Sequence, residues 1–233
     1  ALVNFLEEIY KIGLSVNAIM IDGALSDKDR KIQDDRTRGF FERPDFFDIE
    51  KYKIPSFFVK NHNGEKCMEI MKDINPDVVV NAGTPRIIKA SLLKLPSRGV
   101  VNCHPGLLPA YKGCTCVEWA IYNDNQVGAT CHFMDEGIDT GPIIYSEAMP
   151  IEKGAVYEKV RADMILHQAK VLAKGLKKIH DENLYFDSLS PQNKSEGNYY
   201  KVIPEDKLEE VKKKLIERCP DRNTVGAVRK KAT

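Results

Sequence analysis

Two short apolar runs in the middle of the chain constrain the fold most. Residues 77–82 contain a Val-Val-Val run, residues 99–102 are similarly apolar, and polar residues follow each run. Short runs of β-branched residues are typical of strands that are buried on both faces of a parallel sheet. A short helical pattern at residues 86–94 separates them. This order predicts parallel strands joined by right-handed crossovers, with helices on both faces of the sheet.

Short apolar runs typical of strands and apolar spacing typical of helices also occur in the rest of the chain. Further strands are expected at residues 16–21, 57–59, 129–134 and 143–151. Helices are expected at residues 2–12, 65–74, 115–122, 156–179 and 207–216, and an exposed, partly helical connection at the charge-rich residues 26–43. The expected fold class is α/β, with a doubly wound, mostly parallel sheet. Because such sheets usually begin with a strand and this sequence opens on a helix, we expect a first strand to be missing from it.

Composition after the long helix divides the chain into three expected parts. Residues 1–185 are expected to form one catalytic domain, since a chain of this length can bury a sizeable core in a single domain. Residues 186–222, which begin with many turn formers, are expected to form a short C-terminal extension. Residues 223–233 are basic and rich in small residues, and we expect them to be disordered.

Charge and cysteine content exclude several classes of protein. The 35 basic and 34 acidic residues are nearly balanced, so no global field attracts nucleic acid or an anionic membrane. The six cysteines are dispersed and follow no secretory leader, which indicates reduced thiols in a cytoplasmic protein. A single residue separates Cys114 from Cys116, which is not the spacing of a structural zinc site. We therefore expect no metal, nucleic-acid or membrane partner, whereas a homodimer is compatible with the sequence.

Two polar segments follow predicted strands, where ligands of such sheets bind. One begins at Asn102 and His104 and continues to Gly113, with two prolines and two glycines that stiffen it. A rigid loop is what a preorganised site requires. The other leaves a strand and enters an acidic turn that contains Asp139. Taken singly, Asp139 is better explained as a turn former, and His104 equally well as a hydrogen-bonded scaffold residue.

Together these segments resemble the folate-dependent formyltransferase family. Three motifs occur in the family's order and spacing: Asn-x-His-Pro-x-Leu-Leu-Pro-x-Tyr-x-Gly from Asn102, Gly-Ala-Thr-x-His-Phe-Met from Gly128, and Gly-Ile-Asp-Thr-Gly-Pro-Ile-Ile from Gly137. The resemblance extends over residues 54–173. It implies an enzyme in which a primary amine attacks the formyl carbon of a co-substrate, 10-formyltetrahydrofolate.

The resemblance also implies roles for individual residues. Asn102 would donate its amide to the developing oxyanion, His104 would stabilise that charge or relay a proton, and Asp139 would orient the imidazole. Cys103, which alternates with them on an extended backbone, is expected to point away and pack. Folate binding would fall to two loops, whose residues are Arg86, Ile87 and Ile88 in the first and Asp135, Glu136, Gly137 and Ile138 in the second.

Parts of this folate assignment have plain alternatives. A role as an exposed cation at a helix start explains Arg86 about as well as contact with the glutamate tail of the folate does. Ile87 and Ile88 are also compatible with core packing, which does not conflict with a pocket wall.

The acceptor amine is less constrained than the donor. Val-Glu-Trp-Ala from Val117, and the tail residues Gln192, Gly197, Asn198 and Tyr199, resemble members that act on nucleotide-linked amino sugars. Glycinamide ribonucleotide is a close second acceptor, and the lack of a basic surface disfavours tRNA. A hydrolase that releases formate, and a non-catalytic folate- or nucleotide-binding module, are the remaining alternatives.

Overall fold

The computed structural model describes residues 2–217 except residues 24, 25, 43, 45, 153 and 194. The prediction of a disordered tail at residues 223–233 therefore lies outside the described residues. The helices are α1 (Leu2–Lys11), α2 (Asp27–Thr37), α3 (Glu65–Ile74), α4 (Ala90–Leu93), α5 (Cys116–Tyr122), α6 (Tyr157–Asp181) and α7 (Glu205–Glu217), with 3₁₀ turns at Phe46–Tyr52 and Phe186–Ser188. No helix among these residues is both long and apolar enough to cross a membrane.

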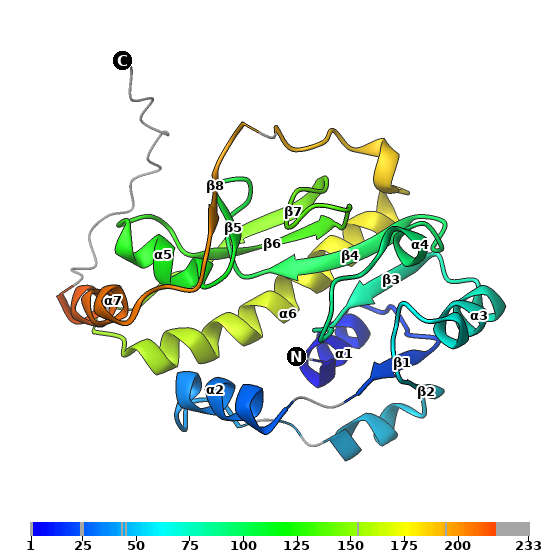
Figure 1. Ribbon diagram of the computed structural model, residues 1–233, viewed down its shortest axis with the longest axis horizontal. Helices are drawn as coiled ribbons and strands as arrows, with labels where there is room; N and C mark the ends of the chain where they lie inside the picture. Colours follow the sequence, from blue (N-terminus) through cyan, green and yellow to red (C-terminus); the bar gives the residue numbers. More distant parts are fainter. Residues whose placement is uncertain are drawn as a thin grey trace.

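The strands form three sheets (Figure 1). A central sheet contains β3 (Val78–Asn81), β4 (Gly99–His104), β6 (Gly128–Phe133) and β7 (Ile143–Ala148), in that order. Two-stranded sheets are formed by β1 (Ile19–Asp22) with β2 (Ser56–Val59), and by β5 (Tyr111–Gly113) with β8 (Asn198–Tyr200). The pairs β1–β2, β3–β4 and β5–β8 are parallel, whereas β4–β6 and β6–β7 are antiparallel.

This arrangement confirms the α/β class with mostly parallel pairing and adds one correction. The parallel expectation does not hold for β6, which runs antiparallel to both of its neighbours, β4 and β7. The expectation of a missing first strand remains a prediction.

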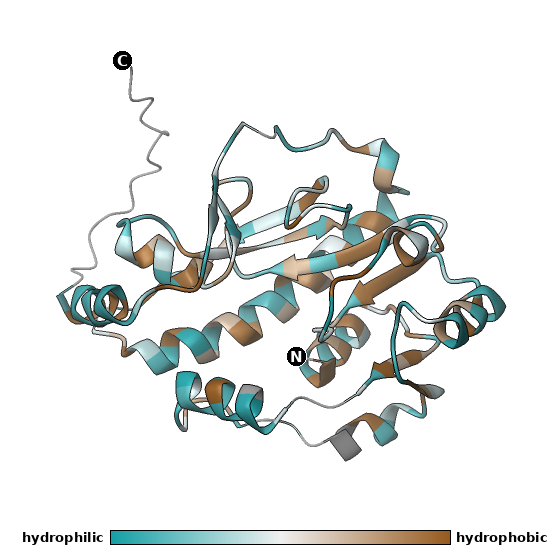
Figure 2. Ribbon diagram, in the orientation of Figure 1, coloured by the Kyte–Doolittle hydropathy of each residue, from teal (hydrophilic) through white to brown (hydrophobic). Residues whose placement is uncertain are grey.

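Helices cover both faces of the central sheet, as predicted. On one face Val101 and Cys103 of β4 pack with Phe5 of α1 and Leu172 of α6. On the other, Val100 packs with α3 and α4. The long α6 runs beside the central sheet in Figure 1, and the apolar colouring of β3 in Figure 2 reflects its position between the two cores. Burial of one such aliphatic side chain contributes about 1.5–3 kcal/mol, so the two cores hold the β4 strand firmly in place.

The predicted helix at residues 86–94 is only partly formed, because α4 begins at Ala90. The side chain of Asn63 accounts for the difference. Its Nδ2 donates to the Ile87 carbonyl at 2.9 Å, and its Oδ1 accepts the Lys89 N–H at 2.9 Å. These bonds hold residues 87–89 outside the helix, with Lys89 extended, in the loop that follows β3.

The C-terminal residues return to the central part of the molecule after α6. The turn-rich segment is mostly irregular, as predicted, but it ends in β8, which the sequence did not indicate. β8 forms because its backbone pairs with β5, which belongs to the polar segment after Asn102. Helix α7 then packs against α5 and α6. The segment after the long helix is thus attached directly to the loop that carries the candidate chemistry.

Candidate active site

Asn102, His104 and Asp139 converge at one place in the fold. Asn102 and His104 lie two residues apart on β4, so their side chains leave the same face of the strand. Asp139 comes from the loop between β6 and β7, and its Oδ2 lies 3.3 Å from Nδ1 of His104. Cys103 points to the opposite face, where it is buried and its Sγ donates to the Gln168 carbonyl at 3.2 Å. The prediction that Cys103 packs is confirmed.

The carboxylate of Asp139 is held by backbone as well as by side chains. Its Oδ2 accepts the N–H of Gly113 at 2.8 Å, and its Oδ1 lies 3.7 Å from Nε2 of His132. The residue has a φ of 56°, in the left-handed region that side chains other than glycine seldom adopt. Its side chain is 11% exposed. A backbone conformation of this kind persists where the surroundings fix it, and it is common at functional sites.

His132 is a member of the site that sequence reasoning missed. It pairs with Asn102 across the β4–β6 ladder, and its Nε2 lies 3.3 Å from the Asn102 Nδ2. Its Nδ1 lies 2.8 Å from the carbonyl of Phe133, which can only accept, so Nδ1 carries the proton in the neutral ring. The signal was present, since His132 lies within a motif, but its contact depends on the antiparallel pairing that was not predicted.

A chain of hydrogen bonds fixes the amide of Asn102. Asn81 donates to the Asn102 Oδ1 at 3.3 Å, and the Asn102 Nδ2 faces the acceptor nitrogen of His132. One N–H of Nδ2 is used by His132, and the second is left for another acceptor. Asn81 also accepts the N–H groups of Gly83 and Thr84. The amide donor is therefore preorganised and connected to the loop that follows β3.

Both ring nitrogens of His104 face acceptors. Nε2 lies 2.8 Å from the Tyr111 carbonyl, which can only accept, so this nitrogen carries a proton in either charge state. Nδ1 faces the Asp139 carboxylate. Burial lowers the pKa of His104, while the Asp139 carboxylate and the Tyr111 carbonyl oppose that shift. With a neutral ring no proton lies between Nδ1 and Asp139, so the pair can accept one.

The first candidate folate loop is held by a buried carboxylate. Arg86 forms an ion pair with Asp22, at the end of β1, and Asp22 also accepts from His62 Nδ1 at 2.7 Å. Ile87 is 74% exposed, whereas Ile88 is buried in the core. The guanidinium of Arg86 thus already has an anionic partner. Among the three residues predicted to contact folate in this loop, Ile87 is the one whose side chain is free to contact a ligand.

The second candidate loop is held internally. Asp135 Oδ1 accepts the N–H of Gly137 at 3.1 Å and the hydroxyl of Thr140 at 2.7 Å. Glu136 is exposed, and Ile138 is 49% exposed beside Asp139. Exposed isoleucines on two fixed loops, next to hydrogen-bonding backbone, fit a flat heterocycle with polar edges such as a pterin. The folate contacts of these residues stay predictions.

Comparison with known proteins agrees with these observations. Residues 14–175 match the Formyl transferase family. A methionyl-tRNA formyltransferase from Kosmotoga olearia is 30% identical over 160 residues, which are 68% of this chain and 50% of that protein. The chain spans about half the length of the curated relatives it matches.

Solved structures show the same fold. Phosphoribosylglycinamide formyltransferase from Bacillus halodurans aligns with a TM-score of 0.58 and 25% identity, covering 78% of this chain and 92% of that one. The formyltransferase PseJ from Anoxybacillus kamchatkensis, solved with UDP-4,6-dideoxy-4-formamido-L-AltNAc and tetrahydrofolate, aligns with a TM-score of 0.54 and 20% identity, covering 82% of this chain and 88% of that one. The family match covers more than half of the chain and includes Asn102, His104 and Asp139, so this protein belongs to the Formyl transferase family.

Proposed function

We propose that the protein transfers a formyl group from 10-formyltetrahydrofolate to a primary amine. The observation that carries the proposal is the convergence of Asn102, His104 and Asp139, with a fixed amide donor on one side and a proton-accepting pair on the other. In this proposal 10-formyltetrahydrofolate supplies the formyl carbon. The amine nitrogen bonds to that carbon, the bond from the carbon to folate nitrogen breaks, and tetrahydrofolate leaves.

Asn102 stabilises the negative charge that develops on the formyl oxygen as the amine attacks. Its second N–H is the donor for this oxygen, and the bonds to Asn81 and His132 keep the amide from rotating. A donor fixed in advance costs no reorganisation when the charge appears. His104, when it takes up a proton, adds positive charge close to Asn102.

Asp139 and His104 manage the proton that the amine must lose. With His104 neutral, the gap between its Nδ1 and the Asp139 carboxylate has no proton. The pair therefore accepts the amine's proton, and the same proton is available to the departing folate nitrogen. Charge and atoms balance over the cycle, because the amine loses one proton and tetrahydrofolate gains one.

For the acceptor we propose a nucleotide-linked amino sugar. The ring of Tyr199 on β8 lies over Gly113, where an added Cβ would approach ring carbon Cε2 at 2.8 Å. Gly113 is the residue whose N–H binds Asp139, and Tyr199 is 55% exposed. An exposed aromatic ring beside the candidate centre suits stacking against a sugar or a base. The PseJ structure supports this choice, because it was solved in complex with a UDP-linked formamido sugar.

Glycinamide ribonucleotide is the second candidate acceptor. The alignment covers 92% of the solved phosphoribosylglycinamide formyltransferase, which supports this acceptor. The near-equal numbers of basic and acidic residues favour either small molecule over tRNA.

A rate assay separates these possibilities. Tetrahydrofolate formation is measured with 10-formyltetrahydrofolate and, in turn, a dTDP- or UDP-linked amino sugar, glycinamide ribonucleotide and methionyl-tRNA. We expect the highest kcat/KM with the nucleotide sugar, and a raised KM for that sugar alone in Tyr199→Ala. Turnover without any amine supports a hydrolase, and tight folate binding with no turnover on any amine refutes the proposal in favour of a binding module.

A further inference from the structure

The segment after the long helix contacts the turn that presents Asp139. Here the C-terminal segment means residues 189–193 and 195–200, which lie outside the family match at residues 14–175. The side-chain amide of Gln192 donates from Nε2 to the Asp139 carbonyl at 3.1 Å and to the Gly141 carbonyl at 2.7 Å. One side chain therefore binds the backbone on both sides of Thr140.

The turn has little freedom on its other side. A Cβ added at Gly141 would overlap the carbonyl oxygen of Phe133, so the backbone already lies directly against β6. The Phe133 N–H donates to the Pro142 carbonyl at 2.9 Å. Gln192 closes the opposite side of a turn in which Asp139 holds a left-handed φ. The two contacts together fix the direction in which the Asp139 side chain leaves the backbone.

The same segment also holds the group that binds the Asp139 carboxylate. β8 pairs with β5, the N–H of Asn198 donates to the Ala110 carbonyl at 3.1 Å, and the N–H of Cys114 donates to the Tyr200 carbonyl at 2.9 Å. These bonds position Gly113, whose N–H donates to Asp139 Oδ2. The C-terminal segment thus binds the backbone of Asp139 directly and positions the Gly113 N–H that binds its carboxylate.

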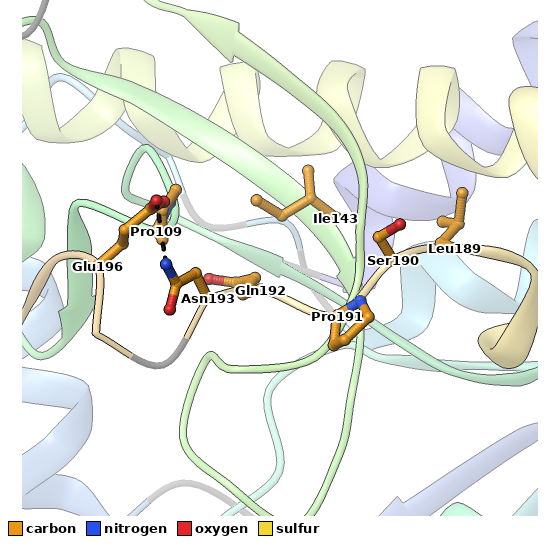
Figure 3. Close-up of a pocket in the computed structure, with 8 residues that line it drawn as sticks. All are labelled: Pro109, Ile143, Leu189, Ser190, Pro191, Gln192, Asn193 and Glu196. Carbon is orange, nitrogen blue, oxygen red and sulfur yellow. Dashed lines mark hydrogen bonds between the residues drawn. The ribbon is translucent and has the colours of Figure 1, made fainter.

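Figure 3 shows the C-terminal segment where it lines a pocket of about 330 Å³. Gln192 lies between Pro191 and Asn193, and Pro109 and Ile143 complete the lining. The Asn193 side chain donates from Nδ2 to Glu196 Oε1 at 3.3 Å (Figure 3). Adjacent amides in one segment therefore have different partners, and this difference provides a matched control.

We infer that Gln192 is a positioning residue, which holds Asp139 in the orientation needed for proton transfer. The inference rests on the proposed function for its kinetic consequence, but its structural content is independent of it. A site that loses a fixed orientation of this kind loses rate while retaining substrate affinity.

Three variants test the inference. Gln192→Met keeps the length of the side chain and removes both donors, whereas Gln192→Glu places a carboxylate before two carbonyl oxygens. Asn193→Ala removes the neighbouring amide, which binds Ser195 and Glu196. We expect both Gln192 variants to lower kcat about tenfold or more and to leave the KM for 10-formyltetrahydrofolate within about twofold. Asn193→Ala should match the wild type.

Amide hydrogen exchange supplies a readout that does not need turnover. We expect faster exchange in Gln192→Met at residues 137–141 and 110–114, with unchanged exchange in α6. A lower melting temperature with unchanged kcat, or unchanged exchange in the two segments, overturns the inference. If the wild type transfers no formyl group to any amine, the proposed function fails, while the exchange comparison still decides whether Gln192 orders the Asp139 turn.

Discussion

Two buried carboxylates in this protein each face a histidine, yet their surroundings differ. Asp22, at the end of β1, accepts from His62 Nδ1 at 2.7 Å and also pairs with the guanidinium of Arg86. Asp139 lies 3.3 Å from His104 and 3.7 Å from His132, and no Lys or Arg of the described residues lies within ion-pair distance of it. Both carboxylate side chains are largely buried, at 4% and 11% exposed.

The difference indicates that the Asp22 pair has a structural role and that the Asp139 pair can exchange a proton. Burial alone would raise the pKa of Asp22, but hydrogen bonds from Arg86 and His62 outweigh it and lower that pKa. A guanidinium keeps its charge at any physiological pH, so the Asp22 pair is permanently compensated and holds the loop at residues 83–89. Asp139 has histidines as its nearest cationic partners, and burial lowers the pKa values of both His104 and His132. The positive charge that compensates the Asp139 carboxylate therefore depends on whether these histidines are protonated.

The largest expected effect follows from removing the exchangeable charge. Asp139→Asn keeps the shape of the side chain but cannot accept the proton of the amine. We expect kcat to fall about 10²–10⁴-fold, measured as tetrahydrofolate formation at saturating substrates. Glu210→Gln, which neutralises an exposed acid on α7, is the control and should keep the wild-type rate. Equal rates in Asp139→Asn and the wild type would remove the distinction between the two carboxylates.

A somewhat smaller loss is expected from the amide donor. Asn102→Ala removes the N–H that faces the developing charge, and kcat should fall about 10²–10³-fold. Asn81→Ala should cost less than Asn102→Ala, because Asn81 acts by holding the Asn102 amide. The ratio of the two rates sharpens the account of the hydrogen-bond chain. A larger loss in Asn81→Ala than in Asn102→Ala would contradict it.

The structural pair should respond in the opposite way. Asp22→Asn removes the carboxylate that binds Arg86 and His62, and we expect the free energy of unfolding to fall by about 1–3 kcal/mol. The KM for 10-formyltetrahydrofolate should rise, because residues 83–89 lose an anchor, while kcat changes little. Urea unfolding and steady-state kinetics measure the two effects. Asp77→Asn, at an exposed carboxylate that accepts from Ser97, is the control for stability.

The smallest expected effect is a pH dependence of stability. Because burial lowers the pKa values of His104 and His132, the unfolded chain binds these protons more readily than the folded one. The histidines' contribution is complete above their usual pKa of about 6.5 and is lost as the pH falls below it. Urea unfolding at pH 7.5 and pH 5.5 should show lower stability at pH 5.5. Asp22→Asn should show the same difference, since the pKa of Asp22 is lowered from an already acidic value.

Much of the fold could be predicted from periodicity in the sequence. The helices at α1, α3, α5, α6 and α7 and the strands at β3, β4 and β6 all lie where apolar spacing indicated them. The helix expected at residues 86–94 was shortened by the side chain of Asn63, which is a distant contact. β8 was missed because its pairing with β5 involves residues far apart in the sequence. Local patterns contain no information about either contact.

The candidate site was predicted in part, for the same reason. Asn102, His104 and Asp139 were found from motifs and do lie together, but their neighbours depend on tertiary pairing. His132 joins them through an antiparallel register that was not expected. Gln192 was noted in the tail for its resemblance to sugar-modifying enzymes, and nothing in its spacing indicated a bond to the backbone of Asp139.

The fate of the formyl carbon tests the central claim most directly. The wild-type protein is mixed with 10-formyltetrahydrofolate labelled with ¹³C in the formyl group and with a nucleotide-linked amino sugar, and the products are followed by NMR. We predict that the label moves into a formamide on the sugar, in amounts equal to the tetrahydrofolate formed. Label that appears as free formate, or that stays on the folate while the amine is unchanged, would contradict the proposed transfer.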